Sequence, residues 1–484
     1  MRLHRSVLFA IIAAALAITG DAAFAQRVFS RGPSPNVGVS RGDNGYHGGG
    51  HFYGGRGGYF GPAIIGVAPG IVQSFEDDDG SGPPRRPRQA RRSSNAPAAN
   101  ERRMVPNEVI IELASSVSPQ QIEALQRRYR LVRVESQTFA LSGTTLYRWR
   151  ISDRRSVASV IRALETDRIV GSAQPNYLFT LQNEPQAPAE GDPAQYELAR
   201  LHLPQAHALA KGDNVLVAVI DSGIDAAHPE LSGSITESYN ALPSPAAPHR
   251  HGTGIAGLIA AHGKLMGAAP AARILAIRAF DGSGSSAEGT TFNILKGLDW
   301  AAEHNARIIN MSFAGPSDPA IHRGLVAAHK KGIVLVAAAG NAGPKSPPLY
   351  PAADPEVIAV SATDAADKLF PQSSRGRHIA VAAPGAQILV AIPDGGYQVS
   401  SGTSFSAAEV SGIVALMLQR DPKLAPDRVR DILLATARDI GPKGRDVMFG
   451  AGLADAYGAL MAEPTPVAAT GAPERFERAS TGTR

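Results

Sequence analysis

The sequence predicts an α/β protein, with a mostly parallel sheet covered by helices on both faces and a small α+β domain before it. Continuous apolar segments recur after residue 200, as is typical of strands buried on both faces. Segments with helical periodicity alternate with them. A separate group of shorter strand-like and helix-like segments lies between residues 105 and 182. Hydrophobic residues make up 44% of the 484-residue chain, which is enough for a large core.

The composition of the chain excludes several kinds of chemistry. There is no cysteine, which rules out disulfides, cysteine-based zinc sites, iron–sulfur clusters and thiol nucleophiles. The formal net charge is only +5, and the basic residues are scattered along the sequence. We therefore expect no nucleic-acid partner.

The first 25 residues have the pattern of a secretory signal peptide. Arg2 and Arg5 precede an apolar segment of twelve residues, 7–18, and small residues follow, ending at Ala25. A membrane anchor is the alternative, but twelve residues span only about 18 Å of helix, whereas a bilayer core is about 30 Å thick. We expect cleavage after Ala25 and a mature protein that has no membrane span and is secreted or periplasmic.

Residues 26–104 have no periodic pattern and are predicted to be disordered. Glycines are mixed with aromatic residues between positions 46 and 60, and a segment rich in proline and arginine follows between positions 83 and 92. Such compositions cannot bury enough surface to offset chain entropy. Arginines among aromatics could also bind nucleic acid or cell-envelope polymer, but a solvated linker is the favoured interpretation. The tail, residues 463–484, is predicted to be disordered as well.

Residues 105–182 are predicted to form the small α+β domain. The strand-like segments are 108–113, 131–134, 145–151, 169–173 and 175–181, and the helical ones are 120–129 and 157–166. The resulting order, β-α-β-β-α-β, is that of a ferredoxin-like domain. Residues 183–194 are rich in proline and are predicted to be a linker without strands.

Residues 195–462 are predicted to form the larger domain. Its expected strands are 215–220, 273–279, 306–311, 333–339, 357–362 and 379–382, and its expected helices are 251–261, 288–304, 319–331, 403–420 and 426–437. In such sheets the ligand crevice lies beyond the carboxyl ends of the strands. We therefore expect functional residues to follow the strands.

Asp221 and His251 are the first candidates for chemistry. Asp221 ends an apolar strand in an Asp-Ser-Gly sequence, where a plain turn and a catalytic carboxylate are equally good interpretations. His251 begins a glycine-rich helix, where it could be catalytic or could be an ordinary surface histidine. A zinc site built from His228 and His249 together with this pair is a third interpretation. No His-Glu-x-x-His sequence or comparable ligand set occurs in the chain to support it.

Ser404 and Asn341 are the next two candidates. Ser404 begins an apolar helix, where a serine is usually an N-cap. The same position suits a nucleophile, because the helix dipole stabilises a developing oxyanion. Asn341 follows Gly340 directly after a buried strand. It could simply close a turn there, or it could present its side-chain amide to an oxyanion.

The four candidates resemble the signature of the subtilisin-like serine peptidases, the subtilases. Each lies at a strand end or a helix start, and together they follow that family's order along the chain. They are Asp221, His251, Asn341 and Ser404. The resemblance covers residues from about 195 to 460, and the domain at 105–182 is similar to the family's inhibitory propeptide.

The resemblance implies a role for each residue. Ser404 would be the nucleophile, and His251 the general base and then the general acid. Asp221 would fix the imidazole tautomer, and Asn341 would donate to the tetrahedral oxyanion together with the Ser404 N–H. A short segment would pair with the substrate backbone and wall the first specificity pocket: Ser312, Phe313, Ala314 and Gly315.

The resemblance also implies an exported serine endopeptidase that hydrolyses peptide bonds through an acyl-enzyme. The enzyme would be a monomer made as a self-processing zymogen, with its own propeptide as an intramolecular inhibitor and with proteins or peptides as substrates. Self-cleavage is expected between Gln182 and Tyr196. The alternative is a non-catalytic protein that has the same fold and binds its partner through the Gly/Arg-rich segment, residues 26–104.

No cofactor or metal is expected for catalysis. The segment between His251 and residue 267 is short and lacks the loop that ligates calcium in well-known members of the family. Glu230 also replaces an aspartate ligand of that site. A tight calcium site is therefore not expected.

Overall fold

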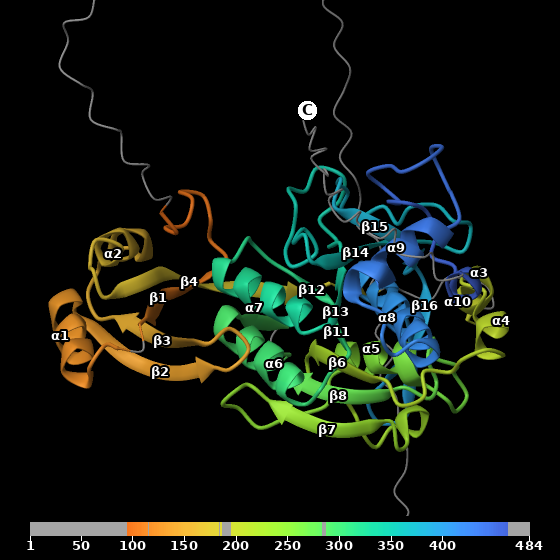
Figure 1. Cartoon of the computed structure of the whole chain (residues 1–484), viewed down its shortest axis with the longest axis horizontal. Helices are drawn as coiled ribbons and strands as arrows, with labels where there is room; N and C mark the ends of the chain where they lie inside the picture. Colours follow the sequence, from red (N-terminus) through yellow and green to blue (C-terminus); the bar gives the residue numbers. More distant parts are fainter. Residues whose placement is uncertain (1–93, 115, 183, 186–194, 283–286, 463–484) are drawn as a thin grey trace, which may run out of the picture. The chain divides into compact units, whose positions relative to one another are not determined.

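The structure is a computed structural model that describes residues 94–462 except 115, 183, 186–194 and 283–286 (Figure 1). All described residues belong to one compact unit of the chain, Arg88–Arg484. The predicted signal peptide, most of the segment 26–104 and the predicted tail lie outside the described residues. In the part of the chain that is described, no helix is long and apolar enough to cross a membrane.

The smaller domain has the predicted order of strands and helices. It consists of β1 (Met104–Leu113), α1 (Pro119–Tyr129), β2 (Leu131–Phe139), β3 (Thr144–Ile151), α2 (Val157–Leu164) and β4 (Val170–Leu181). Its antiparallel strands lie in the order β2-β3-β1-β4. Ser118 and Ser156 cap the two helices by accepting from backbone N–H groups of the first turn. The helices and the sheet enclose a separate core around the fully buried Trp149.

Two boundaries of this domain differ from the prediction. The predicted segments 169–173 and 175–181 form one continuous strand, β4, because Pro175 lies opposite Val109 without ending the ladder. Residues 94–103, predicted to be disordered, are placed ahead of β1. The backbone N–H of Asn95 donates there to the Glu165 carboxylate at the end of α2 (2.6 Å). This anchor comes from a residue 70 positions away, so local composition does not reveal it.

The larger domain contains a seven-stranded parallel sheet, and the predicted α/β class is confirmed. The strands lie in the order β15-β14-β13-β11-β6-β8-β7. Their bounds are β6 (Leu216–Asp221), β7 (Ile235–Asn240), β8 (Arg273–Arg278), β11 (Ile308–Met311), β13 (Val334–Ala338), β14 (Val357–Thr363) and β15 (Ile379–Pro384). The sequence does not predict β7, because this edge strand is largely polar and half-exposed.

Helices cover both faces of this sheet (Figure 1). They are α5 (Arg250–Ala260), α8 (Thr403–Arg420) and α9 (Pro426–Thr436) on one face, and α6 (Thr291–Glu303) and α7 (Pro319–Lys330) on the other. Alternate residues of β6 point to opposite faces. Val217 and Val219 therefore belong to the core beneath α5 and α8, whereas Ala218 and Ile220 belong to the core beneath α6 and α7.

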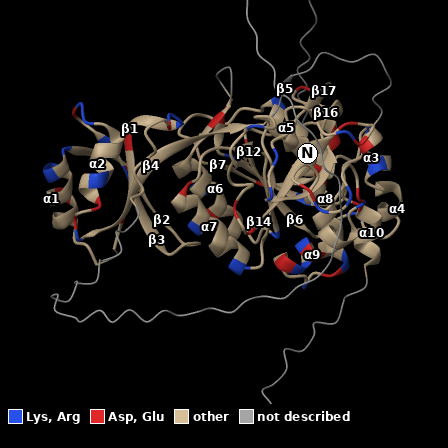
Figure 2. Cartoon of the chain, turned by 90° about the horizontal axis from the view of Figure 1, so that it is seen from above, with Lys and Arg blue, Asp and Glu red and all other residues tan. Residues whose placement is uncertain are grey.

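Short helices and strands complete the fold. The helices are α3 (Tyr196–Arg200), α4 (Leu203–His207) and α10 (Ala456–Met461). Two short strands, β10 (Glu288–Thr290) and β12 (Phe313–Ala314), pair with β4, and β9 (Phe280–Asp281) pairs with β10. The predicted helix 288–304 is therefore wrong at its start, because its first three residues form β10. Acidic and basic residues are interspersed along the described helices and strands (Figure 2).

A small third sheet corrects the prediction for the linker. It contains β16 (Ile388–Ile392), β17 (Gly396–Ser401) and β5 (Glu184–Pro185). The prediction of a linker without strands is wrong at β5, whose two residues pair with Ser400 and Ser401. The pairing partner lies more than two hundred residues further along the chain, so the local sequence gives no signal for it.

Candidate active site

Asp221 and His251 meet at the carboxyl end of the parallel sheet. Asp221 is the last residue of β6, and His251 is in the first turn of α5. Their atoms Oδ1 and Nδ1 lie 2.7 Å apart, and both side chains are fully buried. The other ring nitrogen of His251, Nε2, is buried and has no hydrogen-bond partner among the described residues. A buried imidazole held at Nδ1 by a carboxylate is a proton acceptor at Nε2.

Ser404 lies in the first turn of α8, close to the end of the smaller domain. Its Oγ lies 2.6 Å from the carbonyl oxygen of Gln182 and 2.9 Å from that of Ser312. Gln182 directly follows β4, so a peptide carbonyl of the chain itself reaches the candidate nucleophile. Ser404 is fully buried beneath this segment.

Asn341 is positioned by the turn that follows β13. Gly340 has a φ of 102°, and a Cβ there would lie 2.5 Å from the Leu349 side chain, so only glycine fits this turn. The side-chain oxygen of Asn341 accepts from the Thr403 N–H (3.1 Å) and from the Thr403 hydroxyl (3.0 Å). These bonds fix the amide. Its Nδ2 is buried and makes no hydrogen bond within the described part of the chain, which leaves a free donor on a side chain held by Thr403, the residue before Ser404.

The four residues predicted to bind substrate lie along the end of β4. In β12, Phe313 pairs with Leu181 and Ala314 pairs with Thr180. The N–H of Gln182 donates to the Ser312 carbonyl (3.3 Å). A Cβ on Gly315 would lie 2.2 Å from the ring of Phe179, so glycine is required where this ring packs.

The opposite side of β4 pairs with β10, which places Gly289 across from Phe179. The end of β4 is therefore held between two strands, and β5 then pairs with β17 on the far side of Ser404. Sequence reasoning missed β10, β5 and β17. Strands β5 and β10 have only two and three residues and so no periodicity to detect, and the six residues of β17 are mostly polar.

The zinc interpretation finds no support in the described residues. Both ring nitrogens of His228 are engaged, one by the Glu230 N–H (3.2 Å) and one by the Gly396 carbonyl (3.2 Å). His249 contacts the Ser222 hydroxyl through Nδ1 (2.8 Å).

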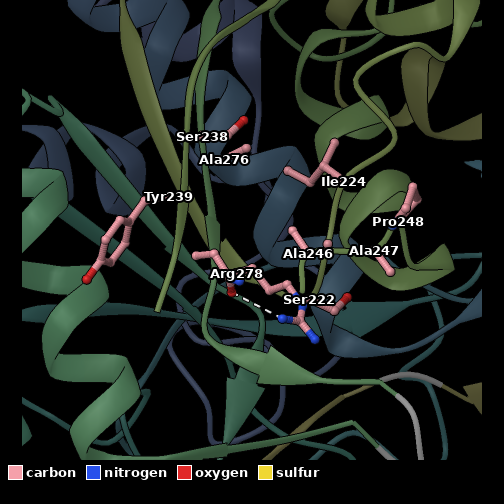
Figure 3. A pocket seen from close by; sticks show the side chains of 11 residues that line it. Ser222, Ile224, Ser238, Tyr239, Ala246, Ala247, Pro248, Ala276 and Arg278 are labelled. Carbon is pink, nitrogen blue, oxygen red and sulfur yellow. Dashed lines mark hydrogen bonds between the residues drawn. The ribbon is translucent and has the colours of Figure 1, made fainter. Parts of the chain in front are cut away.

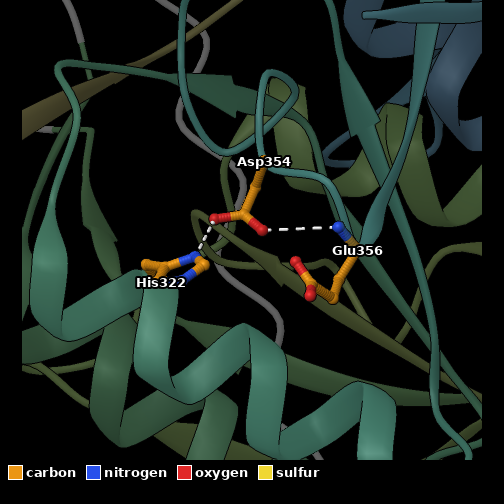
Figure 4. Close-up of side chains that lie close together, drawn as sticks. All are labelled: His322, Asp354 and Glu356. Atoms are coloured by element: carbon orange, nitrogen blue, oxygen red, sulfur yellow. Dashed lines mark hydrogen bonds and ion pairs between the residues drawn. The ribbon is translucent and has the colours of Figure 1, made fainter.

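One group of side chains within the described residues has ligand atoms close enough to hold a metal ion. It consists of His322, Asp354 and Glu356 (Figure 4). Nδ1 of His322 is already hydrogen-bonded to Asp354 (2.7 Å), and the group lies outside the cluster around Ser404.

Glu230 makes direct contacts where a calcium loop was expected to be missing. Its carboxylate accepts from the backbone N–H groups of Gly263 (3.0 Å), Lys264 (2.9 Å) and Leu265 (3.0 Å) and from the Tyr397 hydroxyl (2.7 Å). Burial alone would raise the pKa of Glu230, but these hydrogen bonds outweigh it and lower the pKa below the usual value. Protein donors thus occupy both carboxylate oxygens.

A cavity of about 330 Å³ begins at Ser222, the residue that follows Asp221 (Figure 3). Ser222, Tyr239 and Arg278 are among its lining residues. The Arg278 guanidinium is tied to the side chain of Asn240 (3.1 Å) and to Ser244. Arg278 therefore gives this cavity one polar group that is held in place.

Comparisons with known proteins point to a single family. A sequence model described as the Subtilase family matches residues 212–452. Subtilisin from Bacillus pumilus is 36% identical over 278 residues, which cover 55% of this chain and 98% of that protein. Thermitase from Thermoactinomyces vulgaris is 33% identical over 275 residues, covering 55% of this chain and 96% of that protein.

Two further relatives are longer than the matched region. The minor extracellular protease Epr of Bacillus subtilis is 37% identical over 267 residues, covering 54% of this chain and 40% of that protein. The crystal structure of fervidolysin from Fervidobacterium pennivorans, a keratinolytic enzyme related to subtilisin, superposes with a TM-score of 0.64 at 25% identity. That match covers 75% of this chain and 62% of the fervidolysin chain.

Proposed function

Because the chain belongs to the subtilase family and is a serine-type endopeptidase, we propose that it works through Asp221, His251 and Ser404. We further propose that it is exported as a zymogen that cuts its own chain, and that substrates are other proteins or peptides. Two observations carry the proposal: Ser404 Oγ lies 2.6 Å from the Gln182 carbonyl oxygen, and Nε2 of His251 is buried and has no partner among the described residues.

The proposed reaction begins with attack of Ser404 Oγ on the carbonyl carbon. His251 Nε2 takes the hydroxyl proton, and Asp221 stabilises the imidazolium that forms. The oxyanion turns toward the free Nδ2 of Asn341 and the Ser404 N–H. His251 then gives its proton to the leaving amine, which departs as the acyl-enzyme forms. Water repeats the cycle: it gives a proton to His251, attacks the ester, and releases the acid with Ser404 restored.

The path of the chain through the site supports self-cleavage of the bond between Gln182 and Asn183. Strand β4 pairs with β10 and β12 before this bond, and β5 pairs with β17 after it. A substrate held by backbone pairing on both sides reacts in an effectively unimolecular step. The predicted interval for self-cleavage, between Gln182 and Tyr196, thus narrows to its first bond.

Two further parts of the proposal concern the state of the enzyme. The smaller domain, residues 105–182, would remain an inhibitor after the cut, because β4 fills the strand-binding surface. The pattern in residues 1–25 and the extracellular relative Epr support export. We expect the mature enzyme to be a monomer that needs no cofactor.

Labelling with a fluorophosphonate tests the mechanism. This reagent reacts only with an activated serine. The processed wild type should be labelled, and Ser404→Ala and His251→Ala should not. Ser232→Ala, which changes an exposed serine, serves as the control and should label like wild type. Labelling of Ser404→Ala at the wild-type level would overturn the assignment of the nucleophile.

A further inference from the structure

The side chain of Gln182 is held more closely than backbone pairing requires. Its Oε1 accepts from the backbone N–H of Asn341 (2.8 Å). Its Nε2 donates back to its own strand, to the Thr180 carbonyl (2.9 Å) and the Thr180 hydroxyl (3.2 Å). Both ends of the amide are therefore used, one by the larger domain and one by the substrate segment.

The surroundings fix which end of the amide faces which partner. The Asn341 N–H can only donate, so the atom opposite it must be the carbonyl oxygen. The Thr180 carbonyl can only accept, so the atom opposite it must be the NH₂ group. A glutamate in this place would turn a carboxylate oxygen toward the Thr180 carbonyl and lose that bond. Leucine and methionine would leave the Asn341 N–H unpaired.

We propose, resting on the proposed function above, that this enzyme prefers substrates with glutamine on the carbonyl side of the bond that it cuts. The backbone N–H of Asn341 is the group that recognises the glutamine. Asn341 thus binds the glutamine side chain through its backbone N–H, while its own Nδ2 is free to receive the oxyanion. Binding of the side-chain amide thus positions the reacting carbonyl against Ser404.

The size of the preference follows from the unpaired donor. A site that hydrogen-bonds a polar substrate group rejects analogues that lack this group, because its own donor is left buried without a partner. We expect kcat/KM to fall about tenfold or more when glutamine is replaced by methionine or leucine. Glutamate should be disfavoured at least as strongly, because it also places a charge beside carbonyl oxygens.

Competing peptides test the proposal with the self-processed full chain. The reference peptide copies residues 178–185, Leu-Phe-Thr-Leu-Gln-Asn-Glu-Pro. Three others carry Met, Leu or Glu in place of the glutamine. A fourth exchanges Leu and Gln, which keeps the composition and moves the amide by one position. Two peptides at a time compete for the enzyme in one tube. Inhibition by the released smaller domain then affects both peptides equally and cancels from the ratio of their kcat/KM values. Mass spectrometry identifies the bond that is cut.

A second measurement uses the precursor itself. Gln182→Met and Gln182→Glu should slow self-cleavage about tenfold, whereas Gln120→Met, on the exposed side of α1, should process at the wild-type rate.

The outcomes separate this inference from the proposed function. Preferred cleavage after glutamine in the reference peptide, with the exchanged peptide cut slowly, would support it. Hydrolysis of casein together with equal kcat/KM for all five peptides would overturn it and leave the endopeptidase intact. Absence of casein hydrolysis and of fluorophosphonate labelling would overturn the proposed function, and this inference with it.

Discussion

His249 holds the first turn of the helix that carries His251. Its Nδ1 accepts from the His251 N–H (3.3 Å) and from the Ser222 hydroxyl (2.8 Å), whose oxygen also lies 3.0 Å from Asp221 Oδ1. Burial lowers the pKa of His249; Asp221 opposes this, whereas His251 and Arg250 lower it further. The neutral ring is therefore the form that caps α5, because a protonated Nδ1 cannot accept.

Exchange of His249 tests this cap. Its pKa is lower in the folded protein, so its contribution to stability is present above about pH 6.5 and is lost as pH falls below that value. In a Ser404→Ala background, which prevents autolysis, His249→Ala should lower the free energy of unfolding by about 1 kcal/mol at pH 8. His249→Asn keeps an acceptor that does not titrate. Between pH 8 and pH 5, the melting temperature should fall less in His249→Asn than in the parent protein with His249. Identical pH profiles of the melting temperature would refute the cap.

Asn341→Ala should separate catalysis from recognition. Loss of Nδ2 should lower kcat by about 10²–10³-fold with little change in KM, which is the loss known for the oxyanion-hole asparagine of subtilisin. The backbone N–H remains, so the preference for glutamine should persist in the slow variant. Steady-state kinetics on the reference and methionine peptides measure both effects. An unchanged kcat would show that Asn341 is not the oxyanion donor.

At the scale of single elements, the Glu230 carboxylate holds residues 263–265 through hydrogen bonds from three backbone N–H groups. A carboxylate whose pKa is lowered in the folded state stabilises it above the unfolded pKa of about 4.5 and loses that contribution as pH falls through the folded value. Glu230→Gln should therefore lower the free energy of unfolding at pH 7 by about 2 kcal/mol. Glu237→Gln, at a half-exposed carboxylate, is the control and should change it little.

Calcium removal tests the same loop. Because protein donors fill the Glu230 carboxylate, a chelator should shift the melting temperature of the Ser404→Ala protein by only a few degrees. A large fall on chelation, restored by added calcium, would show that an ion stabilises the fold.

Two carboxyl groups are buried in the larger domain, Glu197 in α3 and Glu409 in α8. Burial raises the pKa of Glu197 to about 7, and burial together with the charge of Glu197 raises that of Glu409 well above its usual value. Raised values mean that the folded state holds these protons more tightly. This contribution to stability is complete below about pH 4.5 and is lost as pH rises through about 7.

Glu409→Gln should flatten this pH dependence. Glutamine is neutral without binding a proton, so less stability should be lost between pH 5 and 8 than with Glu409 present. Thermal melts of the two proteins in the Ser404→Ala background provide the measurement. An equal change of melting temperature with pH in the two proteins would contradict the raised pKa values of this pair.

The elements that the sequence predicts best are those with long apolar periodicity. Helix α8 is predicted with its observed bounds, and the buried strands β6, β13 and β14 lie within about one residue of prediction. The polar edge strand β7 and the very short strands carry no such signal. For the site, the positions of Asp221 and Ser404 at element ends follow from local sequence. The contact of Gln182 with Asn341 spans 159 residues and depends on tertiary packing alone.

At the scale of the whole molecule, the smaller domain completes a sheet with the larger one. Strand β4 belongs to the sheet of the smaller domain and also pairs with β10 and β12 of the larger domain, so it links the two domains. Parallel sheets such as β11-β6-β8 pair residues far apart in sequence and fold slowly. We expect the smaller domain to speed folding by presenting β4 as a template, and a chain that begins at residue 195 to refold more slowly than the Ser404→Ala precursor.

The uncut chain through the site makes self-cleavage the central claim. The most direct measurement is N-terminal sequencing of wild type and Ser404→Ala, both made without residues 1–25 in a protease-free translation system, with Ser232→Ala as the control. Wild type and Ser232→Ala should yield a new N-terminus at Asn183, at a rate independent of protein concentration, and Ser404→Ala should stay intact. Cleavage of Ser404→Ala at the same bond would contradict the account.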